Sequence, residues 1–567
     1  MLTRKLSAIL TFAAISGLLL VSCTPAAAPT ATPKPAAPAP TKAPAAPAAK
    51  PTTPPAAKPA APSPTPKAAA EQPRYGGILS ISFPADPPSF DIHQETTAAA
   101  LEPLCPAYDT LIQTDLRTWK IVGDLAERWE VSPDGLTYTF YLHKGVKWHD
   151  GKPFSSTDVK YSLDRQNDPP KGIRSGRKQQ FESVDRIEAP DENTVKIVMK
   201  QPYMAFVPQF ATDWFVVMPK HILEAKGDMK KDVLGTGPFK FKSYSQGTSI
   251  ELVKNPDYFV KGLPYLDGIT FYIIKDGSTR FSAFRTGRVK MTAHWAPLTP
   301  SEAAQIRAEQ PNLAIWSYPG LGGPWYNINS SKPPFDDVRV RQAASLAFDR
   351  QAAIKVLAEG EAKPGTFLPP GEWGLPEQEI LKLPGYRQPK DADRAEAKKL
   401  LAEAGHPNGF KMELLVRAVR LDQKAGEFLK DQLATIGITA DIQVMETAVY
   451  NTHTASGNFQ FGVQQVVWRI NDPDELSRKF LTGADQNYGK WSSKKFDDLF
   501  AEQSRTLDPA KRKGITRELD EILLKEWPAI WPYWGDALLG SWPEVKNFAA
   551  PPGLYSSMRN ADLWLAK

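Results

Sequence analysis

Alternating hydrophobic and polar residues predict β-strands in the part of the chain that follows residue 73. Residues 78–83 alternate in this way after Gly76 and Gly77, and residues 138–142 and 194–199 repeat the pattern. A period of two is typical of strands that bury one face. Residues 132–135 (Ser-Pro-Asp-Gly) predict a turn before the second of these strands. Further strands are predicted over residues 239–244, 250–253 and 461–467.

Hydrophobic residues at helical spacing predict the helices. One helix begins at residues 155–158 (Ser-Ser-Thr-Asp), because short polar side chains there can cap the first turn. A single long helix is predicted over residues 338–357, and another over residues 393–404, which Gly405 ends.

Residues 411–444 combine both kinds of pattern. A strand over 411–416 precedes a helix over 424–436, which Gly437 ends, and a second strand follows over 438–444. This order is a βαβ unit, whose two strands run parallel. Strand groups followed by a βαβ unit predict an α/β protein with more than one lobe.

The first 23 residues predict an export signal. Arg4 and Lys5 precede an apolar run over residues 6–20, which is short for a bilayer-spanning helix and typical of a signal peptide. Residues 20–23 (Leu-Val-Ser-Cys) resemble a bacterial lipoprotein box, in which Cys23 takes the lipid. A plain signal peptide with an incidental cysteine, or a transmembrane anchor, is the alternative.

Residues 24–73 predict a tether. They contain 16 Pro and 19 Ala among 50 residues, a composition with no apolar bulk to bury that favours extended, polyproline-like backbone. Fully extended, such a segment reaches on the order of 150 Å. Recognition of the proline-rich segment by a partner is the alternative, although no aromatic residue or arginine interrupts it.

The charge of the chain is concentrated at its N-terminus. Residues 74–567 carry 62 basic and 62 acidic side chains, so the pI near 8.9 comes from the segments before them. A balanced body argues against a nucleic-acid partner, which requires a basic surface. The two cysteines, Cys23 and Cys105, exclude a disulfide framework and a cysteine-ligated metal site.

Motifs for catalysis and cofactors are missing from the sequence. It contains no G-x-S-x-G, H-E-x-x-H or P-loop motif, so an esterase or peptidase is disfavoured. Gly235 and Gly237 lack the third glycine of a dinucleotide fingerprint, and the spacing of His143 and His149 does not suit a metal. The sequence therefore predicts no enzyme, no cofactor and no metal.

Fifteen tryptophans are the unusual feature of the composition, and Trp527, Trp531, Trp534 and Trp542 lie close together near the end. Most should pack in the core or between lobes, and the remainder are candidates for the wall of a ligand cleft.

Several longer blocks carry a family resemblance. They read LAERWEVSPDG (125–135), GVKWHDG (145–151), STDV (156–159), GTGPF (235–239), NPDYF (255–259), PFDDVRVRQA (334–343) through Asp349-Arg350, AKKLLAEAG (397–405) and LDPAKR (507–512). Together they resemble the extracellular solute-binding proteins of family 5, the peptide, nickel and oligosaccharide binders of ABC importers. The resemblance spans residues 75–567 in the expected order.

The resemblance implies an α/β, type II periplasmic-binding-protein fold with two lobes, an inserted extra domain and a ligand cleft between the lobes. Lobe I would comprise residues 74–108, 233–320 and 540–567, the inserted domain residues 109–232, and lobe II residues 321–539. The chain would cross between the lobes near residues 320–324 and 535–540, where glycines suit a hinge.

One segment departs from the peptide-binding members of the family. Those members carry a Trp-x-x-Asp segment before an Asp-Pro pair, and its aspartate pairs the ligand's α-amino group. Here residues 468–473 read Trp-Arg-Ile-Asn-Asp-Pro, with no acid between Trp468 and Asp472. Since Arg469 would repel an amine, the sequence predicts a neutral polar or anionic ligand and weak binding of free-amine peptides.

The ends of predicted strands supply the candidate ligand-binding residues, because ligands of open α/β sheets sit at the carboxyl ends of strands. Trp468 and Arg469 follow the strand over 461–467, and Arg417 and Arg420 follow the strand over 411–416. Trp325 and Tyr326 come directly after the first crossing. The arginines suit an anionic or hydroxyl-rich ligand. A solvated loop is an equally favoured reading of residues 417–422.

The sequence thus predicts a monomeric, lipid-anchored protein outside the cytoplasm. It would capture a small-molecule or peptide ligand by closure of its lobes and deliver it to an ABC transporter permease. A ligand-sensing or chaperone-like lipoprotein on the same fold, not coupled to a permease, is the alternative function.

Overall fold

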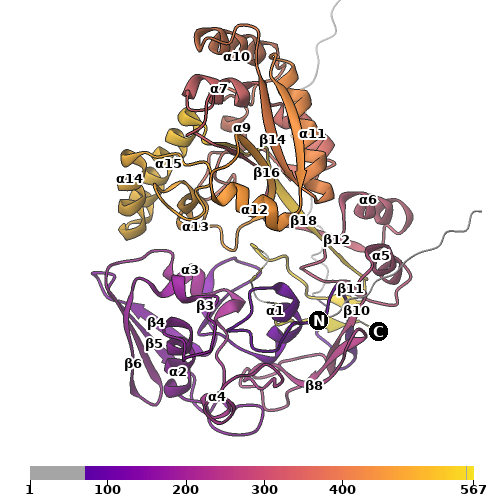
Figure 1. Cartoon of the computed structure of the whole chain (residues 1–567). Helices are drawn as coiled ribbons and strands as arrows, with labels where there is room; N and C mark the ends of the chain where they lie inside the picture. The colour runs from indigo at the N-terminus through magenta and orange to yellow at the C-terminus, as the bar shows by residue number, and fades with distance from the viewer. Residues whose placement is uncertain (1–70, 554, 557, 567) are drawn as a thin grey trace, which may run out of the picture. The chain divides into compact units, whose positions relative to one another are not determined.

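A sheet of twelve strands runs through most of the computed structural model, which describes residues 71–553, 555–556 and 558–566. Lobe I contributes β1 (Ile78–Phe83), β8 (Phe239–Ser245), β9 (Ser249–Lys254), β10 (Gly268–Ile273) and β11 (Met291–Thr292). Lobe II contributes β13 (Ala362–Lys363), β14 (Lys411–Arg417), β15 (Thr439–Met445), β16 (Phe461–Val467) and β17 (Ala529–Ile530). The strands β12 (Ala314–Ile328) and β18 (Trp534–Ser541) join the two groups (Figure 1).

These two joining strands contain the predicted crossings. They pair antiparallel with each other from Ala314 opposite Ser541 to Gly322 opposite Gly535, and the second half of β12 then pairs with β16. A Cβ atom on Gly322 would lie 2.8 Å from the carbonyl oxygen of Val466. Glycine is therefore required there for close approach of two strands, rather than for hinge flexibility alone. The lobe boundaries themselves stay a prediction.

The inserted domain has its own antiparallel sheet. Its strands lie in the order β4 (Ala126–Val131), β5 (Thr137–Leu142), β7 (Thr194–Met199) and β6 (Val184–Asp191). The predicted turn is confirmed, since Gly135 has a φ of +69° and its N–H donates to the Ser132 carbonyl at 2.8 Å. The other elements are β2 (Ile112–Thr114), β3 (Ile121–Gly123), α2 (Ser156–Asn167), η2 (Lys178–Phe181), α3 (Phe206–Phe210), η3 (Asp213–Phe215) and α4 (Lys220–Lys226).

Lobe I carries few helices, and its remaining elements are short. They are α1 (Ala98–Leu104), η1 (Cys105–Ala107), α5 (Gly277–Arg285), α6 (Pro300–Glu309), β19 (Val545–Lys546) and β20 (Trp564–Leu565). The pair β19–β20 is antiparallel and lies outside the main sheet.

Lobe II contains the predicted βαβ unit. Strands β14 and β15 pair in parallel from Lys411 opposite Thr439, and α11 (Arg420–Ala434) connects them before Gly437, whose φ is +88°. The other helices are α7 (Val338–Ala347), α8 (Arg350–Leu357), α9 (Glu377–Ile380), α10 (Asp391–Glu403), α12 (Thr447–Ala455), α13 (Pro473–Ser477), η4 (Arg478–Phe480), α14 (Lys494–Arg505) and α15 (Pro509–Glu526).

The prediction of one helix over residues 338–357 is wrong, because two helices share this stretch. Phe348 takes an extended backbone, and Asp349 caps α8 by accepting a hydrogen bond from the Ala352 N–H at 3.0 Å. An aspartate that can satisfy a free N–H favours a new helix start over continuation. Hydrophobic spacing alone does not reveal such a break.

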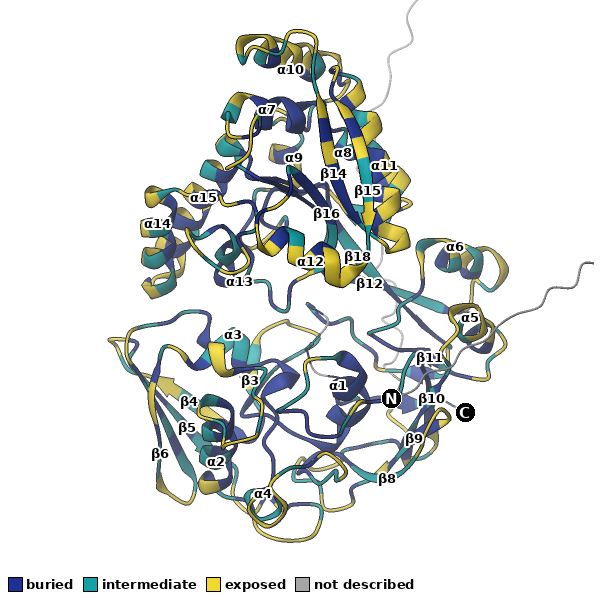
Figure 2. Cartoon of the chain, in the orientation of Figure 1, coloured by how far each residue is buried: buried dark blue, intermediate teal, exposed yellow. Residues whose placement is uncertain are grey.

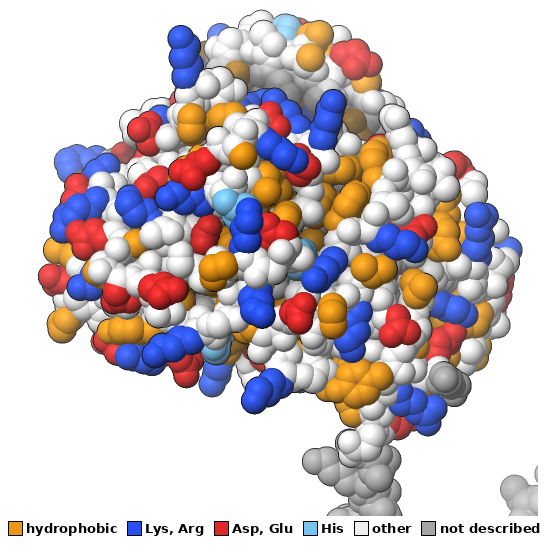
Figure 3. Space-filling view, turned by 90° about the horizontal axis from the view of Figure 1, so that it is seen from below, with side chains coloured by type: hydrophobic (Ala, Val, Ile, Leu, Met, Phe, Trp, Pro, Cys, Tyr) orange, Lys and Arg blue, Asp and Glu red, His pale blue; other side chains and the backbone are white. Residues whose placement is uncertain are grey.

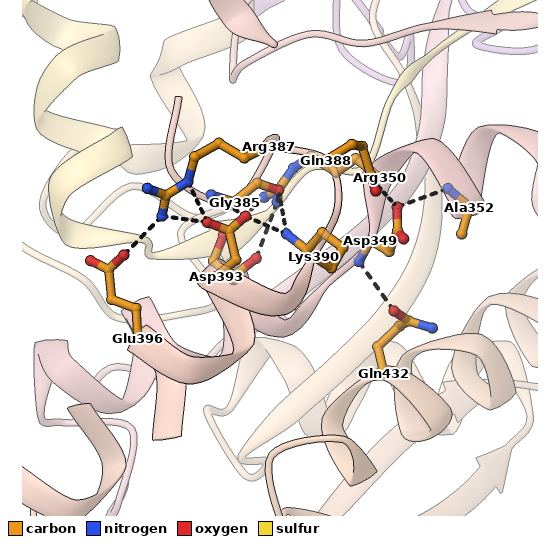
Figure 4. A network of polar contacts seen from close by, with 11 residues as sticks. Asp349, Arg350, Ala352, Gly385, Arg387, Gln388, Lys390, Asp393, Glu396 and Gln432 are labelled. Carbon is orange, nitrogen blue, oxygen red and sulfur yellow. Dashed lines mark hydrogen bonds and ion pairs between the residues drawn. The ribbon is translucent and has the colours of Figure 1, made fainter. Parts of the chain in front are cut away.

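A buried polar network fixes this break in place (Figure 4). Arg350 is 1% exposed and donates to the carbonyls of Ser345 and Gly385 at 3.1 and 2.8 Å. Lys390 donates to the Asp393 carboxylate at 2.6 Å, and burial lowers the pKa of Lys390 to about 8. The Asp349-Arg350 pair of the family resemblance therefore has a structural role.

The core of lobe II contains an aromatic cluster, which we define as Trp325, Trp468, Trp531, Trp534 and Phe480. All five side chains are less than 5% exposed. Their contacts include Trp468–Trp531 and Trp531–Trp534, with ring centroids 4.8 and 4.6 Å apart. Figure 2 shows buried residues along the strands and exposed ones on the outer faces of α10 and α11.

Candidate functional site

A cavity of about 690 Å³ lies between the inserted domain and lobe II. Its volume falls in the range typical of small-molecule sites. The inserted domain contributes Thr114, Trp119, Lys120, Ile121, Val131, Tyr138, Met204, Val207, Pro208 and Thr212. Lobe II and the crossing contribute Pro319, Leu321, Glu372, Trp373, Arg469, Ile470, Asn471, Asp472, Leu507, Pro509 and Arg512, and the C-terminal segment adds Pro552, Gly553 and Ser556.

Aromatic side chains face this cavity from both sides. Trp119 of the inserted domain is 51% exposed, although its indole N–H donates to the Ala550 carbonyl at 3.1 Å. Trp373 of lobe II is held by a hydrogen bond from its indole to the Asn471 carbonyl at 3.0 Å. Such walls suit a ligand with apolar as well as polar groups.

A buried ion pair forms part of the lobe II wall. Asp472 caps α13, and Arg512 on α15 donates to its two carboxylate oxygens at 2.7 and 3.0 Å. Arg512 also contacts Asp474 at 3.2 Å, and burial followed by the nearby Asp472 charge raises the pKa of Asp474. Because Arg512 already neutralises Asp472, this acid is not free to pair a ligand amine.

Two charged side chains of the wall form no ion pair within the described part of the chain. They are Glu372 of lobe II and Lys120 of the inserted domain. Loss of water contact, followed by repulsion from Asp472, raises the pKa of Glu372. These two groups are available to polar groups of a ligand.

Arg469 is the one predicted residue that the structure places on the cavity wall. Its guanidinium contacts the Glu475 carboxylate at 3.3 and 3.4 Å and is 41% exposed. In the orientation of the Gln180 amide that satisfies both of its polar atoms, the nitrogen donates to the Arg177 carbonyl at 2.6 Å and the oxygen accepts from Arg469 at 3.1 Å. Arg469 therefore links lobe II to the inserted domain.

The other aromatic candidates lie behind the wall. Trp468 is 1% exposed and, with Trp325, belongs to the aromatic cluster. Tyr326 is fully buried, and its hydroxyl donates to the Ala425 carbonyl at 3.2 Å. Direct ligand contact by these three residues stays a prediction, and their packing gives them a supporting position instead.

Arg417 and Arg420, predicted in the loop of the βαβ unit, end β14 and begin α11 instead, and both lie away from the cavity wall. Arg417 is the last residue of β14 and does not follow the strand as predicted; its Nε donates to Asp422 at 2.5 Å, and its side chain is 18% exposed. Arg420 begins α11 on the surface. A role for Arg417 or Arg420 in binding likewise stays a prediction.

Sequence reasoning missed the contribution of the inserted domain. Trp119, Lys120 and Tyr138 lie more than 180 residues before the lobe II residues that line the same cavity. No local sequence pattern predicts that contact. The one available signal was Trp119 itself, since a tryptophan in a polar turn is seldom needed for packing.

Residues 71–553, 555–556 and 558–566 contain no cluster of three or more His, Cys, Asp or Glu side chains suited to a metal. None of the helices in these residues has the length and apolar character of a membrane span. Acidic and basic side chains are mixed on the face in Figure 3, which shows no basic patch. Cys23, the predicted signal peptide and residues 24–70 of the predicted tether lie outside the described residues.

Comparison with known proteins places the chain in context. Residues 120–488 match the model of the bacterial extracellular solute-binding proteins, family 5. The glutathione-binding protein GsiB of Salmonella choleraesuis is 33% identical over 426 residues, which are 72% of this chain and 80% of that protein.

Solved structures agree with this match. The periplasmic binding protein DppA of Helicobacter pylori, in complex with the peptide STSA, has a TM-score of 0.71 and 29% identity, over 87% of this chain and 99% of that one. AgaA from A. tumefaciens R10, in complex with agropinic acid, has a TM-score of 0.69 and 27% identity over 87% and 99%. Both are periplasmic binding proteins, which confirms the predicted fold class.

Proposed function

Because the chain belongs to family 5 of the bacterial extracellular solute-binding proteins, we propose that it captures a peptide-like solute and presents it to an ABC importer permease. The observation that carries this proposal is the cavity of about 690 Å³ with walls from the inserted domain and from lobe II. A site shared in this way is closed and opened by relative movement of its walls. The names of the relatives, which include glutathione and a tetrapeptide, favour a short peptide.

The walls suggest how such a solute is held. Trp119 and Trp373 offer flat apolar surfaces for side chains or peptide planes, and Glu372 and Lys120 offer unpaired charges to polar groups. The aromatic cluster supports the lobe II wall from behind. Strands β12 and β18 connect the two halves and would bend as the lobes close.

Thermal-shift screening tests the ligand class. The full-length protein is heated with di- and tripeptides, glutathione, oligosaccharides, organic acids and nickel chelates. A bound solute raises the unfolding midpoint by mass action. We expect the largest rise with a short peptide or glutathione, which replaces the weak binding of free-amine peptides that residues 468–473 predicted. A rise only with a sugar or nickel chelate would contradict the peptide assignment. If a peptide raises the midpoint and the source cell has no cognate permease, the sensor alternative is favoured.

We also propose that Cys23 carries a lipid and that the Pro/Ala-rich segment tethers the body to a membrane outside the cytoplasm. The Leu-Val-Ser-Cys sequence supports this. Cys23→Ser should move the exported protein from the membrane to the soluble fraction or leave it unprocessed. Fractionation identical to that of the wild type would contradict the anchor.

A further inference from the structure

A small side chamber adjoins the main cavity. Its volume is about 20 Å³, and it shares Thr212, Arg469 and Ile470 with the main cavity. Its remaining walls come from Arg177, Gln180, Gln209, Trp214, Phe215 and Glu475. A space of this size holds about one water-sized group, so it accepts the tip of a ligand and not a side chain.

Arg177 is the unusual residue of this chamber. It is 3% exposed, yet no carboxylate among the described residues forms an ion pair with it. Its Nη2 donates to the Glu95 carbonyl at 2.7 Å, its guanidinium lies 3.9 Å from the centre of the Trp214 ring, and its Nε has no hydrogen-bond partner. A buried guanidinium without an acid is costly, which indicates a partner that arrives from outside.

Positive charges outnumber negative ones around Arg177. Arg469 faces the same chamber, and burial, then repulsion from Arg469, lowers the pKa of Arg177 to about 9. Lys479 lies nearby with its Nζ 4.4 Å from the Trp468 ring, and burial lowers its pKa to about 8. Among the described residues that line the chamber, Glu475 is the single acid, and it contacts Arg469. The chamber therefore keeps an excess of positive charge.

We propose that the side chamber binds a carboxylate of the ligand, with Arg177 and Arg469 donating to its oxygens. This inference rests on the proposed function and names the group that the site selects. Guanidinium groups match the planar geometry of a carboxylate. The small volume favours a carboxylate oxygen over a bulkier tetrahedral anion. The rest of the solute then lies in the main cavity.

Calorimetric titration of the full-length protein tests this. Trialanine and glutathione are each compared with the analogue whose carboxylates are carboxamides. We expect the amides to bind at least tenfold more weakly. Equal binding of acid and amide would overturn the carboxylate site while leaving the proposed function intact. Failure of every peptide, here and in the wider screen, would overturn both.

Variants assign the effect to the chamber. Arg177→Gln should reduce the preference for the acid over the amide to less than about threefold, and Arg177→Lys should retain part of it. Arg174→Gln is the matched control, because this exposed arginine of the same loop does not line either cavity. Thermal unfolding without ligand verifies that each variant is folded. If Arg177→Gln keeps the full wild-type preference for the acid over the amide, the assignment of the carboxylate to this chamber is overturned.

Discussion

Removal of the Trp468 indole should cost stability before it costs binding. Trp468 is 1% exposed, and its ring centroid lies 4.8 Å from that of Trp531 and 5.2 Å from that of Trp534. The sequence predicted a direct ligand contact at this position instead. Because the structure places this ring inside the aromatic cluster, Trp468→Ala leaves a cavity in a packed core.

The expected loss follows from known costs of such cavities. Truncation of a buried tryptophan to alanine costs about 3–5 kcal/mol, part of which comes from aromatic pairs worth roughly 0.5–1.5 kcal/mol each. The Lys479 ammonium, 4.4 Å from the ring centre, loses a cation–π contact as well. We therefore expect a loss of about 4 kcal/mol, which is a large share of the stability of an ordinary domain.

Urea unfolding followed by far-ultraviolet circular dichroism measures this loss. Trp119→Ala is the matched control, because Trp119 is 51% exposed on the cavity wall. That variant should lose less than about 1 kcal/mol and should weaken peptide binding instead. A Trp468→Ala protein within about 1 kcal/mol of the wild type, with peptide affinity reduced tenfold, would refute the packing account and restore the sequence prediction.

Three further predictions concern stability. Burial raises the pKa of Asp520 to about 7. Between about pH 4 and 7 the folded state keeps a proton that the unfolded state releases. The free energy of unfolding should therefore fall as the pH rises through this range, by up to about 1.4 kcal/mol per pH unit. Asp520→Asn should flatten that slope in urea titrations, and an unchanged slope would contradict this. Arg512→Met should lower the free energy of unfolding by about 3–5 kcal/mol, because it leaves Asp472 buried and unpaired. Adding Asp472→Asn should restore most of this stability. A double variant no more stable than Arg512→Met would contradict the coupling of the two residues. Gly322→Ala would place a Cβ 2.8 Å from a β16 carbonyl oxygen and should lower the free energy of unfolding by about 1–3 kcal/mol. Gly514→Ala in α15, which has open space around it, should not destabilise the protein. Equal effects of the two substitutions would contradict the close approach of β12 and β16.

Local patterns predicted the elements well, where local interactions decide them. Alternation gave β1 and β7 with the bounds of the structure, and the parallel βαβ unit is confirmed, although its helix spans Arg420–Ala434 and not residues 424–436. The break at Asp349 was missed because a capping carboxylate competes with helix continuation, and the hydrophobic spacing is the same in both cases.

The candidate site was harder to predict, because side chains at strand ends can turn to neighbours as well as to a ligand. Arg469 reaches the cavity wall, but Arg417 pairs with Asp422, five residues further along the chain. Trp119 and Arg177 reach the site through packing between the inserted domain and lobe II. That packing depends on contacts across hundreds of residues, which a single sequence does not reveal.

The central claim is that the cavity between the inserted domain and lobe II binds one peptide-like solute. Calorimetric titration of the full-length protein with di- and tripeptides and glutathione tests it most directly. We predict that at least one of these solutes binds with one site per chain and a Kd in the micromolar range or below, about −8 kcal/mol, and that Trp119→Ala weakens this binding. Absence of binding by every member of the panel, or binding that Trp119→Ala and Arg177→Gln both leave unchanged, would contradict the claim.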